Sequence, residues 1–278
     1  MIKMENVWFS YDGRKYALKG VSAEFHEGNY YAILGDNGSG KTTLLKHLNG
    51  LLRPNKGRVL VDGLDTKKIP VSILSKKVAL SFQNPEAMFF SSTVYDEIAF
   101  ALRNFGYKKE VIDRLVGKVL SIFDLDRYSN YSPFNLSEGE KRRLAIACVY
   151  AWEPKYLVLD EPTAGQDQIQ RELLVYVIKH VVRQGRTVII ASHDVEFIAE
   201  TKPYIFLLKE GKILREGPAE EVLLDEKALE KAGLIIPYIA QVFKSLDSER
   251  YRKIPINPDE ASDLILNFIK RDDNFDDS

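Results

Sequence analysis

A glycine-rich stretch between a strand-like run and a helix-like run constrains this chain more than any other part of the sequence. It reads Gly35-Asp-Asn-Gly-Ser-Gly-Lys41-Thr42-Thr43; apolar residues 30–34 precede it, and residues 44–48 begin a helical pattern. The stretch fits the phosphate-loop pattern G-x-x-x-x-G-K-[ST], which requires strand, loop and helix in that order. The sequence therefore predicts a phosphate-binding loop at the start of a helix.

The residue types in this loop suit a phosphate chain. The glycines let the backbone turn tightly and present N–H groups, and the following helix adds the positive end of its dipole. Lys41 is expected to reach the β- and γ-phosphates, and the Thr42 hydroxyl to hold Mg²⁺. We expect the loop to bind a nucleoside triphosphate through Asn37, Gly38, Ser39, Gly40, Lys41, Thr42 and Thr43.

The composition narrows the classes of protein to which the chain can belong. It has 278 residues, of which 45% are hydrophobic, enough for one domain of ordinary size plus an addition. The 39 Lys and Arg residues are balanced by 40 Asp and Glu residues, which argues against a basic nucleic-acid groove. A single cysteine, Cys148, excludes an internal disulfide. We expect a cytosolic chain, because we find no N-terminal signal segment and no apolar run approaching about 18 residues.

Strand-like runs fall on both sides of the phosphate loop. Those in residues 2–33 are short and separated by turn residues, which predicts an antiparallel layer. A hairpin pattern in residues 205–215 closes the strand-rich part of the chain. Further strands are predicted at residues 78–83, 156–159 and 187–192, and a strand with its turn at residues 59–63.

A helix-rich segment interrupts these strands. From residue 84 to about residue 150 the apolar residues follow a helical spacing, which predicts a helical subdomain inserted in the core. Ser137 is followed three residues later by Glu140, the arrangement of a capping box at the start of a helix. The predicted helices cover residues 94–104, 109–123 and 141–150.

Two carboxylates follow the apolar run at residues 156–159. Asp160 and Glu161 would stand at the carboxyl end of a buried parallel strand, where open α/β sheets place their ligands. The first acid would help to bind Mg²⁺, and the second would orient or deprotonate an attacking water. His193 follows the strand at 187–192 and should point toward the same edge of the sheet. Plain turn residues are the alternative for the acid pair.

Two other residues are ambiguous when spacing alone is considered. Gln83 ends a predicted strand, so its amide would point toward a ligand or simply begin a loop. Tyr11 lies before the phosphate loop, where an aromatic ring would stack on a base or pack as an ordinary sheet residue. Spacing alone favours the ordinary interpretation for both.

Taken together, these motifs resemble the ATP-binding subunit of an ABC transporter across residues 1 to about 217. The resemblance implies that Lys41 lies in the Walker A motif and that Asp160 and Glu161 form Walker B with its catalytic glutamate. It makes His193 the switch histidine, Gln83 a Q-loop residue that serves catalysis and Mg²⁺, and Tyr11 the adenine-stacking aromatic. It also implies a signature segment, residues 136–140, and a D-loop, residues 164–167. The expected site residues of the signature segment are Ser137, Gly139 and Glu140, which would act on ATP held by a partner subunit. The expected site residue of the D-loop is Asp167.

The implied fold is a P-loop NTPase of the α/β class. An ABC ATPase domain would occupy residues 1–217, with an antiparallel β layer and a helical subdomain at about 84–150. Residues 218–278 would form a small C-terminal helical extension that contacts a second ATPase. One apolar helix face is predicted there from Ala261, Leu264, Ile265, Phe268 and Ile269, and the acidic end, residues 272–277, is predicted to be a solvated tail.

One segment narrows the resemblance further. Residues 83–90, Gln-Asn-Pro-Glu-Ala-Met-Phe-Phe, and residues 93–100 are similar to the Q-loop region of energy-coupling factor (ECF) transporter ATPases. Residues 229–240 resemble their post-core segment. The resemblance implies an ATP hydrolase, peripheral on the cytoplasmic face of the membrane, that uses ATP and Mg²⁺ to energise import of a vitamin or transition-metal ion. The implied partners are a second ATPase subunit, a transmembrane coupling protein and a membrane substrate-binding protein, with no nucleic acid.

Three residues depart from the family pattern. The usual Gly-Gly of the signature segment is Glu138-Gly139, its usual glutamine is Glu140, and the usual leucine of the D-loop is Gln166. These departures favour a heterodimer with a different ATPase chain. They also leave open that the chain is a weakly catalytic partner subunit, and a soluble ABC ATPase without a transport role is a separate alternative. The transported substrate is not encoded in this chain.

Overall fold

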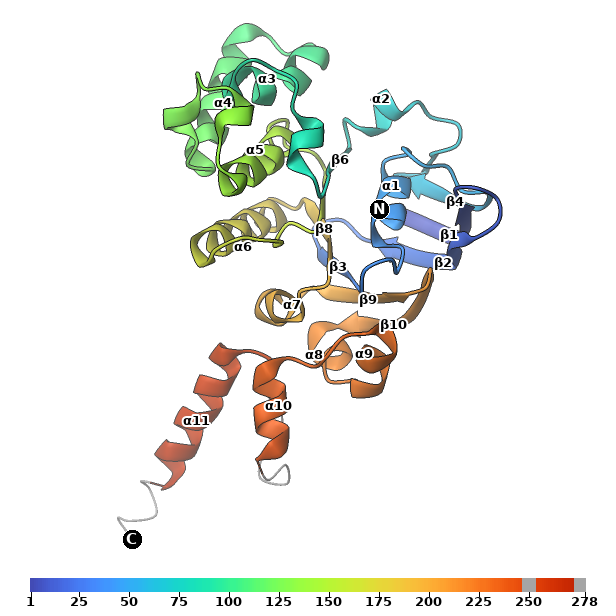
Figure 1. The fold of residues 1–278 in the computed structure, drawn as a ribbon, viewed down its shortest axis with the longest axis vertical. Coiled ribbons are helices and arrows are strands. Elements are labelled where there is room, and N and C mark those ends of the chain that lie inside the picture. The colour runs from blue at the N-terminus through green and yellow to red at the C-terminus, as the bar shows by residue number, and fades with distance from the viewer. Residues whose placement is uncertain (247–253, 273–278) are drawn as a thin grey trace.

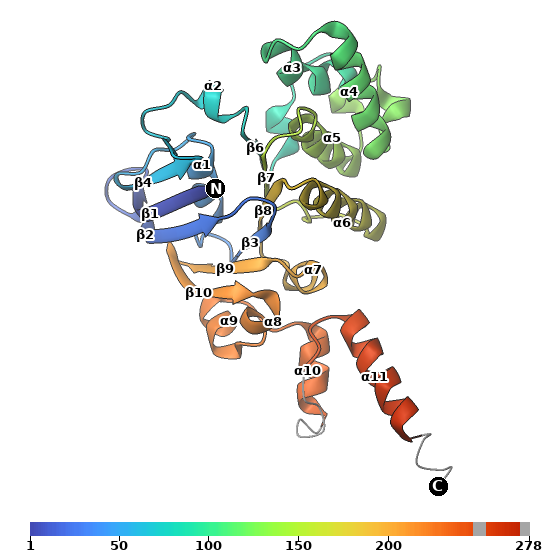
Figure 2. The same cartoon turned by 180° about the vertical axis from the view of Figure 1, so that it is seen from behind.

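Two β-sheets with a helix between them form the centre of the molecule, as Figures 1 and 2 show from opposite sides. The computed structural model describes residues 1–246 and 254–272, with the backbone alone for residues 268–272. A lobe of helices stands at one end of the sheets, and two helices project from the other end. The phosphate loop lies where the central helix begins.

The larger sheet carries the predicted parallel strands. Within the described chain it has six strands in the order β10-β9-β3-β8-β7-β6, parallel except for β10, which pairs antiparallel with β9. Asp160 pairs with Ala191 and Leu34 with Ser192, so the carboxyl ends of three strands meet at one edge. The bounds are β3 Tyr30–Leu34, β6 Val78–Ser81, β7 Tyr156–Asp160, β8 Thr187–Ser192, β9 Tyr204–Lys209 and β10 Lys212–Pro218.

The predicted antiparallel layer is present and is larger than residues 2–33. In the described chain its order is β2-β1-β4-β5, so strands that follow the phosphate loop complete it. Helix α1, Lys41–Leu48, lies between the two sheets, and Leu44, Leu45 and Leu48 are fully buried there. The strands are β1 Ile2–Ser10, β2 Tyr16–Phe25, β4 Lys56–Val61 and β5 Leu64–Asp65.

The helix-rich segment folds as a separate lobe at one end of the sheets (Figure 1). Its helices pack through Val94, Ile98 and Leu144, all of which are fully buried. The predicted capping box is confirmed, because Ser137 and Glu140 make both of its hydrogen bonds, and the third helix therefore starts at Glu138. The elements are η1 Pro85–Met88, α3 Val94–Asn104, α4 Lys109–Ile122, η2 Asp126–Tyr128, η3 Pro133–Asn135 and α5 Glu138–Tyr150.

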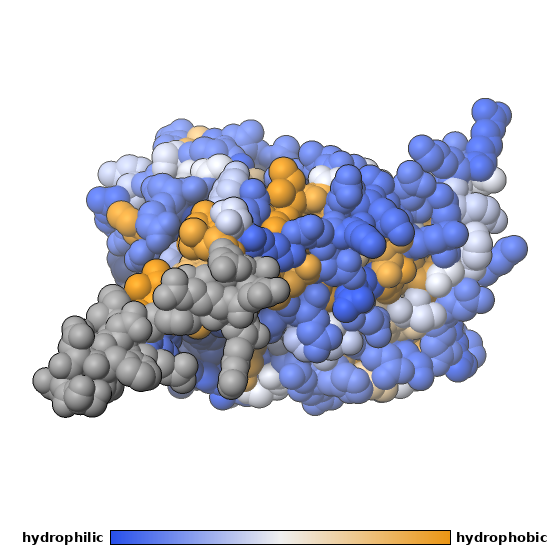
Figure 3. Space-filling model, turned by 90° about the horizontal axis from the view of Figure 1, so that it is seen from below, coloured by the Kyte–Doolittle hydropathy of each residue, from blue (hydrophilic) through white to orange (hydrophobic). Residues whose placement is uncertain are grey.

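Most of the remaining helices cover the face of the large sheet opposite α1 or extend away from it (Figure 1), whereas Leu74 of α2 belongs to the core around α1. Figure 3 looks at the end that carries the last two and shows apolar side chains exposed among hydrophilic ones. In the described chain, no helix is long and apolar enough to cross a membrane. The bounds are α2 Val71–Leu74, α6 Gln168–Arg183, α7 Val195–Thr201, α8 Ala219–Val222, α9 Glu226–Ala232, α10 Tyr238–Ser245 and α11 Pro258–Asp272.

The apolar face predicted near the C-terminus lies on α11 but is only partly buried. Ala261 is buried, whereas Ile265 is 48% exposed. The side chains of Phe268 and Ile269 lie outside the described residues, as does the predicted solvated tail from residue 273 onward.

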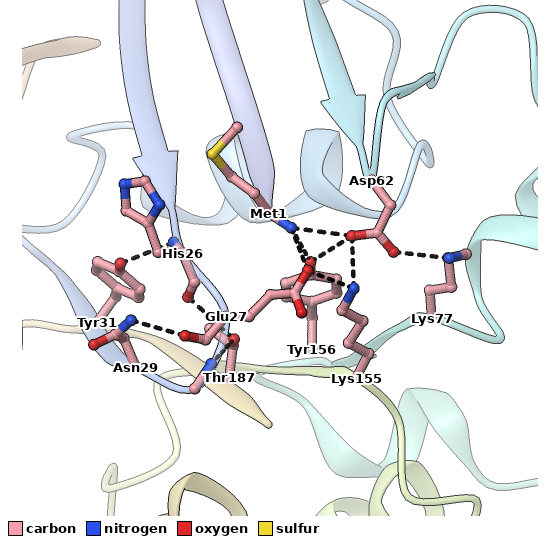
Figure 4. Close-up of polar contacts among 11 residues, drawn as sticks. Met1, His26, Glu27, Asn29, Tyr31, Asp62, Lys77, Lys155, Tyr156 and Thr187 are labelled. Carbon is pink, nitrogen blue, oxygen red and sulfur yellow. Dashed lines mark hydrogen bonds and ion pairs between the residues drawn. The ribbon is translucent and has the colours of Figure 1, made fainter. Parts of the chain in front are cut away.

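A polar cluster joins the two sheets at the end away from the phosphate loop (Figure 4). Asp62, in the turn after β4, accepts hydrogen bonds from Lys77 at 2.7 Å, Lys155 at 2.9 Å and Tyr156 at 2.7 Å. The Met1 amino group lies 3.0 Å from the same carboxylate. Burial opposes ionisation of Asp62, but these hydrogen bonds outweigh it and hold the pKa well below its usual value.

Candidate active site

The phosphate loop joins β3 to α1 through glycines that other residues could not replace. Gly38 and Gly40 have φ values of +75° and +109°, in the left-handed region. A Cβ atom on Gly35 would lie 2.3 Å from the Leu208 carbonyl oxygen, so the close approach of β9 requires a glycine. The loop thereby opens directly onto the N-terminus of α1, whose N–H groups suit an anion.

Lys41 is buried and its ammonium group is held inside this loop. Its Nζ donates to the carbonyl oxygens of Gly35 at 2.8 Å and Asp36 at 3.1 Å. It also lies 3.1 Å from Oε1 of Glu161, and both side chains are at most 6% exposed. The pairing brings the predicted Walker A lysine and the predicted catalytic glutamate into contact.

Glu161 follows β7 with a backbone that re-aims its side chain. Its φ is +48°, in the left-handed region that non-glycine residues adopt rarely. The backbone N–H donates to Ala191 on β8 at 2.9 Å, which fixes the turn. Oε2 lies 2.9 Å from Nδ1 of His193, a half-exposed side chain at the end of β8. Glu161 therefore lies between a lysine and a histidine.

Asp160 is the side chain whose environment best fits a magnesium ion. It is 4% exposed, and its Oδ1 has no hydrogen-bond partner among the described residues. Burial raises the pKa of this carboxyl, while a hydrogen bond with Thr42 opposes that effect. An ion here would satisfy the buried oxygen, and hydroxyl and amide oxygens from Thr42 and Gln83 are hard donors of the kind Mg²⁺ prefers.

The described residues contain no cluster of three or more His, Cys, Asp or Glu side chains that could hold a metal. Mg²⁺ at Asp160 would therefore need phosphate oxygens or water as further ligands, as is usual for this ion beside a nucleotide. The residues present fit such a site.

Two adjoining hollows run along the phosphate loop. One of about 210 Å³ is lined by the loop together with Gln83 and Glu161. The other, about 460 Å³, is lined by Tyr11, a residue that is 62% exposed and whose hydroxyl lies 3.1 Å from Oγ1 of Thr43. Ala17 and Gly38 border both hollows, so the two lie next to each other.

Sequence reasoning missed several residues of the second hollow. Lys15 and Lys19 line it, and so does Glu210, which the turn between β9 and β10 brings in from the far end of the chain. None of the three carries a sequence signal, because Lys15 and Glu210 are charged residues in turns and Lys19 is a charged residue within β2. A larger hollow of about 1000 Å³ lies beside β2 and the start of β9 and contains no predicted site residue.

The signature segment and the D-loop lie apart from these hollows. None of Ser137, Gly139 and Asp167 is among the described residues that line either one. Glu140 turns into its own helix cap, where its carboxylate accepts from the Ser137 N–H at 2.7 Å. Glu138 pairs with Arg142 at 3.3 Å. Both unexpected carboxylates therefore have partners within their own chain.

A family model described as ABC transporter matches residues 18–164. The chain belongs to the ABC transporter ATPase family. This ATPase is 44% identical to a putative ABC transporter ATP-binding protein of Pyrococcus horikoshii over 91% of this chain and 96% of that protein. It is 39% identical to the energy-coupling factor transporter ATP-binding protein EcfA2 of Clostridium perfringens, over 90% of this chain and 91% of that protein.

Solved structures agree with this family. The chain resembles cbiO1 of Clostridium perfringens, part of the ABC transporter complex cbiONQ, with a TM-score of 0.74 and 32% identity over 87% of this chain and 98% of that one. It resembles the dimeric ATP-binding cassette MJ0796 in a post-hydrolysis state with ADP and Pi, with a TM-score of 0.72 and 28% identity over 79% and 99%. The expected fold is confirmed, and the chain is an ATP-binding, ATP-hydrolysing transport ATPase of a family whose members dimerise and work with transmembrane components.

Proposed function

We propose that this ATPase energises an ECF-type importer of a vitamin or a transition-metal ion through a transmembrane coupling protein. The observation that carries the proposal is the position of Glu161, which lines the phosphate hollow together with Lys41 and lies between Lys41 and His193. The importer class is supported by the similarity to EcfA2 over 90% of the chain.

The residues of the site divide the work of hydrolysis. Phosphates in the loop compete with Glu161 for the Lys41 ammonium group, which frees the Glu161 carboxylate to orient or deprotonate water. His193 contacts the γ-phosphate, and Tyr11 stacks on adenine in the second hollow. Thr42, Asp160 and Gln83 would hold Mg²⁺, which neutralises charge on the phosphates when bound.

The signature segment and D-loop serve a second ATPase in this proposal. Because they do not line the hollows of their own chain, Ser137 and Gly139 act on ATP held by a partner's Walker A motif, with Glu140 as the cap that orders them. Asp167 of the D-loop faces the same interface. A different ATPase chain is the partner we infer, since Glu138, Glu140 and Gln166 depart from the usual pattern.

We also propose boundaries for the ATPase domain and for a segment that contacts the second ATPase. Residues 1–217 form the ATPase domain, about 84–150 its helical subdomain, and 218–278 an extension that contacts the second ATPase. Apolar side chains on and before α10 support that contact, because Ile235, Tyr238 and Val242 are 71%, 70% and 52% exposed.

An exposed aromatic pair on the helical lobe supports docking of the coupling protein. Phe90 and Phe100 are 60% and 44% exposed, and their rings meet edge to face at 4.5 Å. They lie just after the Q-loop, so a partner that covers them is linked to Gln83 and the phosphate hollow. Such contact would keep the ATPase at the cytoplasmic face of the membrane.

The test is ATP-dependent uptake by membrane vesicles that carry this ATPase with its native membrane proteins. Replacing Phe90 and Phe100 by serine should lower both uptake and retention of the ATPase by at least about tenfold, because interface aromatics dominate binding. Tyr107→Ser, an exposed aromatic on the same lobe, is the matched control. Full hydrolysis without any ATP-dependent uptake of a vitamin or metal ion would favour a soluble ABC ATPase without a transport role.

A further inference from the structure

One side chain in the first turn of α6 reaches the signature segment of the same chain. Gln170 is the third residue of α6, and its backbone N–H donates to Oδ1 of Asp167 at 2.9 Å. Its side-chain amide packs on Gly139, where a Cβ atom would lie 2.0 Å from Nε2 of Gln170. Gln170 therefore contacts the D-loop through its backbone and the signature segment through its side chain.

A second contact joins the same two segments. Arg142 extends from α5 over the D-loop, so that its Nη2 lies 3.6 Å from the Cβ position of Gly165. The same guanidinium pairs with Glu138 in the signature segment at 3.3 Å. Gly165 has a φ of +64°, in the left-handed region that favours glycine. Because glycine has no side chain, the guanidinium of Arg142 can lie close to the D-loop backbone at this point.

The first turn of α6 is also fixed on the side of the switch histidine. Arg171 lies 3.0 Å from the carboxylate of Asp194, the residue after His193. Neighbouring residues of one helical turn thus contact the signature segment and the switch region. A rigid helix end held from both sides is a suitable element for fixing the position of a loop.

We infer that Gln170 is a positioning residue that holds the signature segment and the D-loop of one chain as a single unit. The inference rests on the proposed function, in which both segments act on the partner's ATP. Through Gln170, a displacement of the D-loop displaces Ser137 and Gly139 as well. Gly139 then serves two purposes, approach to the partner's nucleotide and room for the Gln170 amide.

The contact works through packing and not through hydrogen bonding. Gln170 Oε1 is buried and has no hydrogen-bond partner among the described residues. An apolar side chain of the same length should therefore replace the amide, because an unpaired buried polar atom contributes nothing that methionine lacks. Gln170→Met should retain the wild-type arrangement, whereas Gln170→Ala should release the signature segment.

The experiment measures ATP hydrolysis by the full ATPase dimer in a double-mutant cycle of Gly139→Ala and Gln170→Ala. Gln170→Ala should lower hydrolysis at least about fivefold, within the usual range for coupled neighbours. Gly139→Ala should cost at least about threefold less in the Gln170→Ala background, because its methyl group no longer expels the amide. ATP binding to the chain alone should remain unchanged, which shows that the variants are folded.

Hydrogen exchange tests the contact between Gln170 and Gly139 in the single chain, without the second ATPase. Amides in the first turn of α5 should exchange faster in Gln170→Ala and at the wild-type rate in Gln170→Met. Gln168→Ala is the control, since Gln168 lies in the same turn, is exposed and bonds to Glu172 at 3.1 Å. The inference would be overturned if the losses of hydrolysis in Gly139→Ala and Gln170→Ala were simply additive in the double mutant. It would also be overturned if the amides in the first turn of α5 exchanged at the wild-type rate in Gln170→Ala. A different outcome would separate the two proposals. If Gly139→Ala left ATP hydrolysis unchanged while Gln170→Ala still speeded hydrogen exchange, the proposal that the signature segment acts on the partner's ATP would be wrong. The contact between Gln170 and Gly139 would still hold.

Discussion

At the scale of single residues, the site depends on which partner Glu161 has. Its carboxylate lies within 3.1 Å of Lys41 and 2.9 Å of His193, so the same oxygen pair that would activate water is bound by two nitrogen donors. A buried carboxylate needs such partners, because an unpaired charge there is costly. Nucleotide phosphates would offer Lys41 a stronger partner. The Glu161 carboxylate would then lose its contact with the lysine and become available to water.

Glu161→Gln should keep ATP binding and lower turnover by about 10²–10⁴-fold, the usual contribution of a general base. The amide has nearly the same shape but cannot accept a proton, so ATP should persist and prolong the lifetime of the ATPase dimer. Steady-state hydrolysis and dimer lifetime with ATP are the measurements. Glu153→Gln, a half-exposed site paired with Lys118, is the matched control. Near-normal turnover in Glu161→Gln would remove this residue from the catalytic role.

At the scale of elements, the Asp62 cluster joins the antiparallel sheet to the amino ends of β6 and β7 (Figure 4). Asp62→Asn should lower the free energy of unfolding at pH 7 by about 2 kcal/mol, since hydrogen bonds to a charged group are lost. The depressed pKa means that this stabilisation exists above the unfolded value of about 3.9 and disappears as pH falls through the folded value.

The measurement is chemical denaturation of wild type and of Asp62→Asn from pH 7 down to values below about 4. The difference between Asp62→Asn and wild type should narrow as pH falls below about 4. Asp65→Asn, in the same β4–β5 hairpin but outside the cluster, should show a smaller effect. A difference that stays constant with pH would mean that the Asp62 charge does not carry the stabilisation.

Local elements were predictable from the sequence, whereas their pairing was not. The start of α5 followed from Ser137 and Glu140, because a capping box is encoded within four residues. The contact between Lys41 and Glu161 depends on β3, β8 and β7 lying side by side, which periodicity does not encode. Glu210 lines the second hollow because the turn between β9 and β10 lies against β2, where the Lys19 N–H donates to the Gly211 carbonyl at 2.8 Å, and such a long-range contact is not encoded locally.

At the scale of the whole molecule, the C-terminal extension is attached to the helix that follows the switch histidine. Glu196 of α7 accepts from the N–H of Tyr238 at 2.9 Å, and Asn257 donates to the carbonyl of Ala199 at 2.9 Å. The extension is thus fixed to α7 at the start of both projecting helices, α10 and α11 (Figure 1). A protein bound to those helices would be linked to the nucleotide site.

Deleting the residues after Asn257 should weaken association of two ATPase chains in the absence of nucleotide by at least about tenfold. The deletion removes α11 and its exposed Ile265 and Leu266 but keeps the buried Asn257 anchor. Analytical ultracentrifugation of the ATPase pair measures the change, and ATP binding to the shortened chain reports whether it is folded. Unchanged association would mean that α11 packs only on its own chain.

The central claim is that this chain holds one ATP with Lys41 and serves another with Ser137. Ser137→Arg should leave ATP binding by the chain alone within about twofold of wild type, because that residue lines neither hollow of its own chain. Lys41→Ala should abolish that binding. In the ATPase dimer both variants should lower hydrolysis, the first through the partner's site. If both variants instead abolish ATP binding by the isolated chain, the two residues serve the same site and the account is wrong.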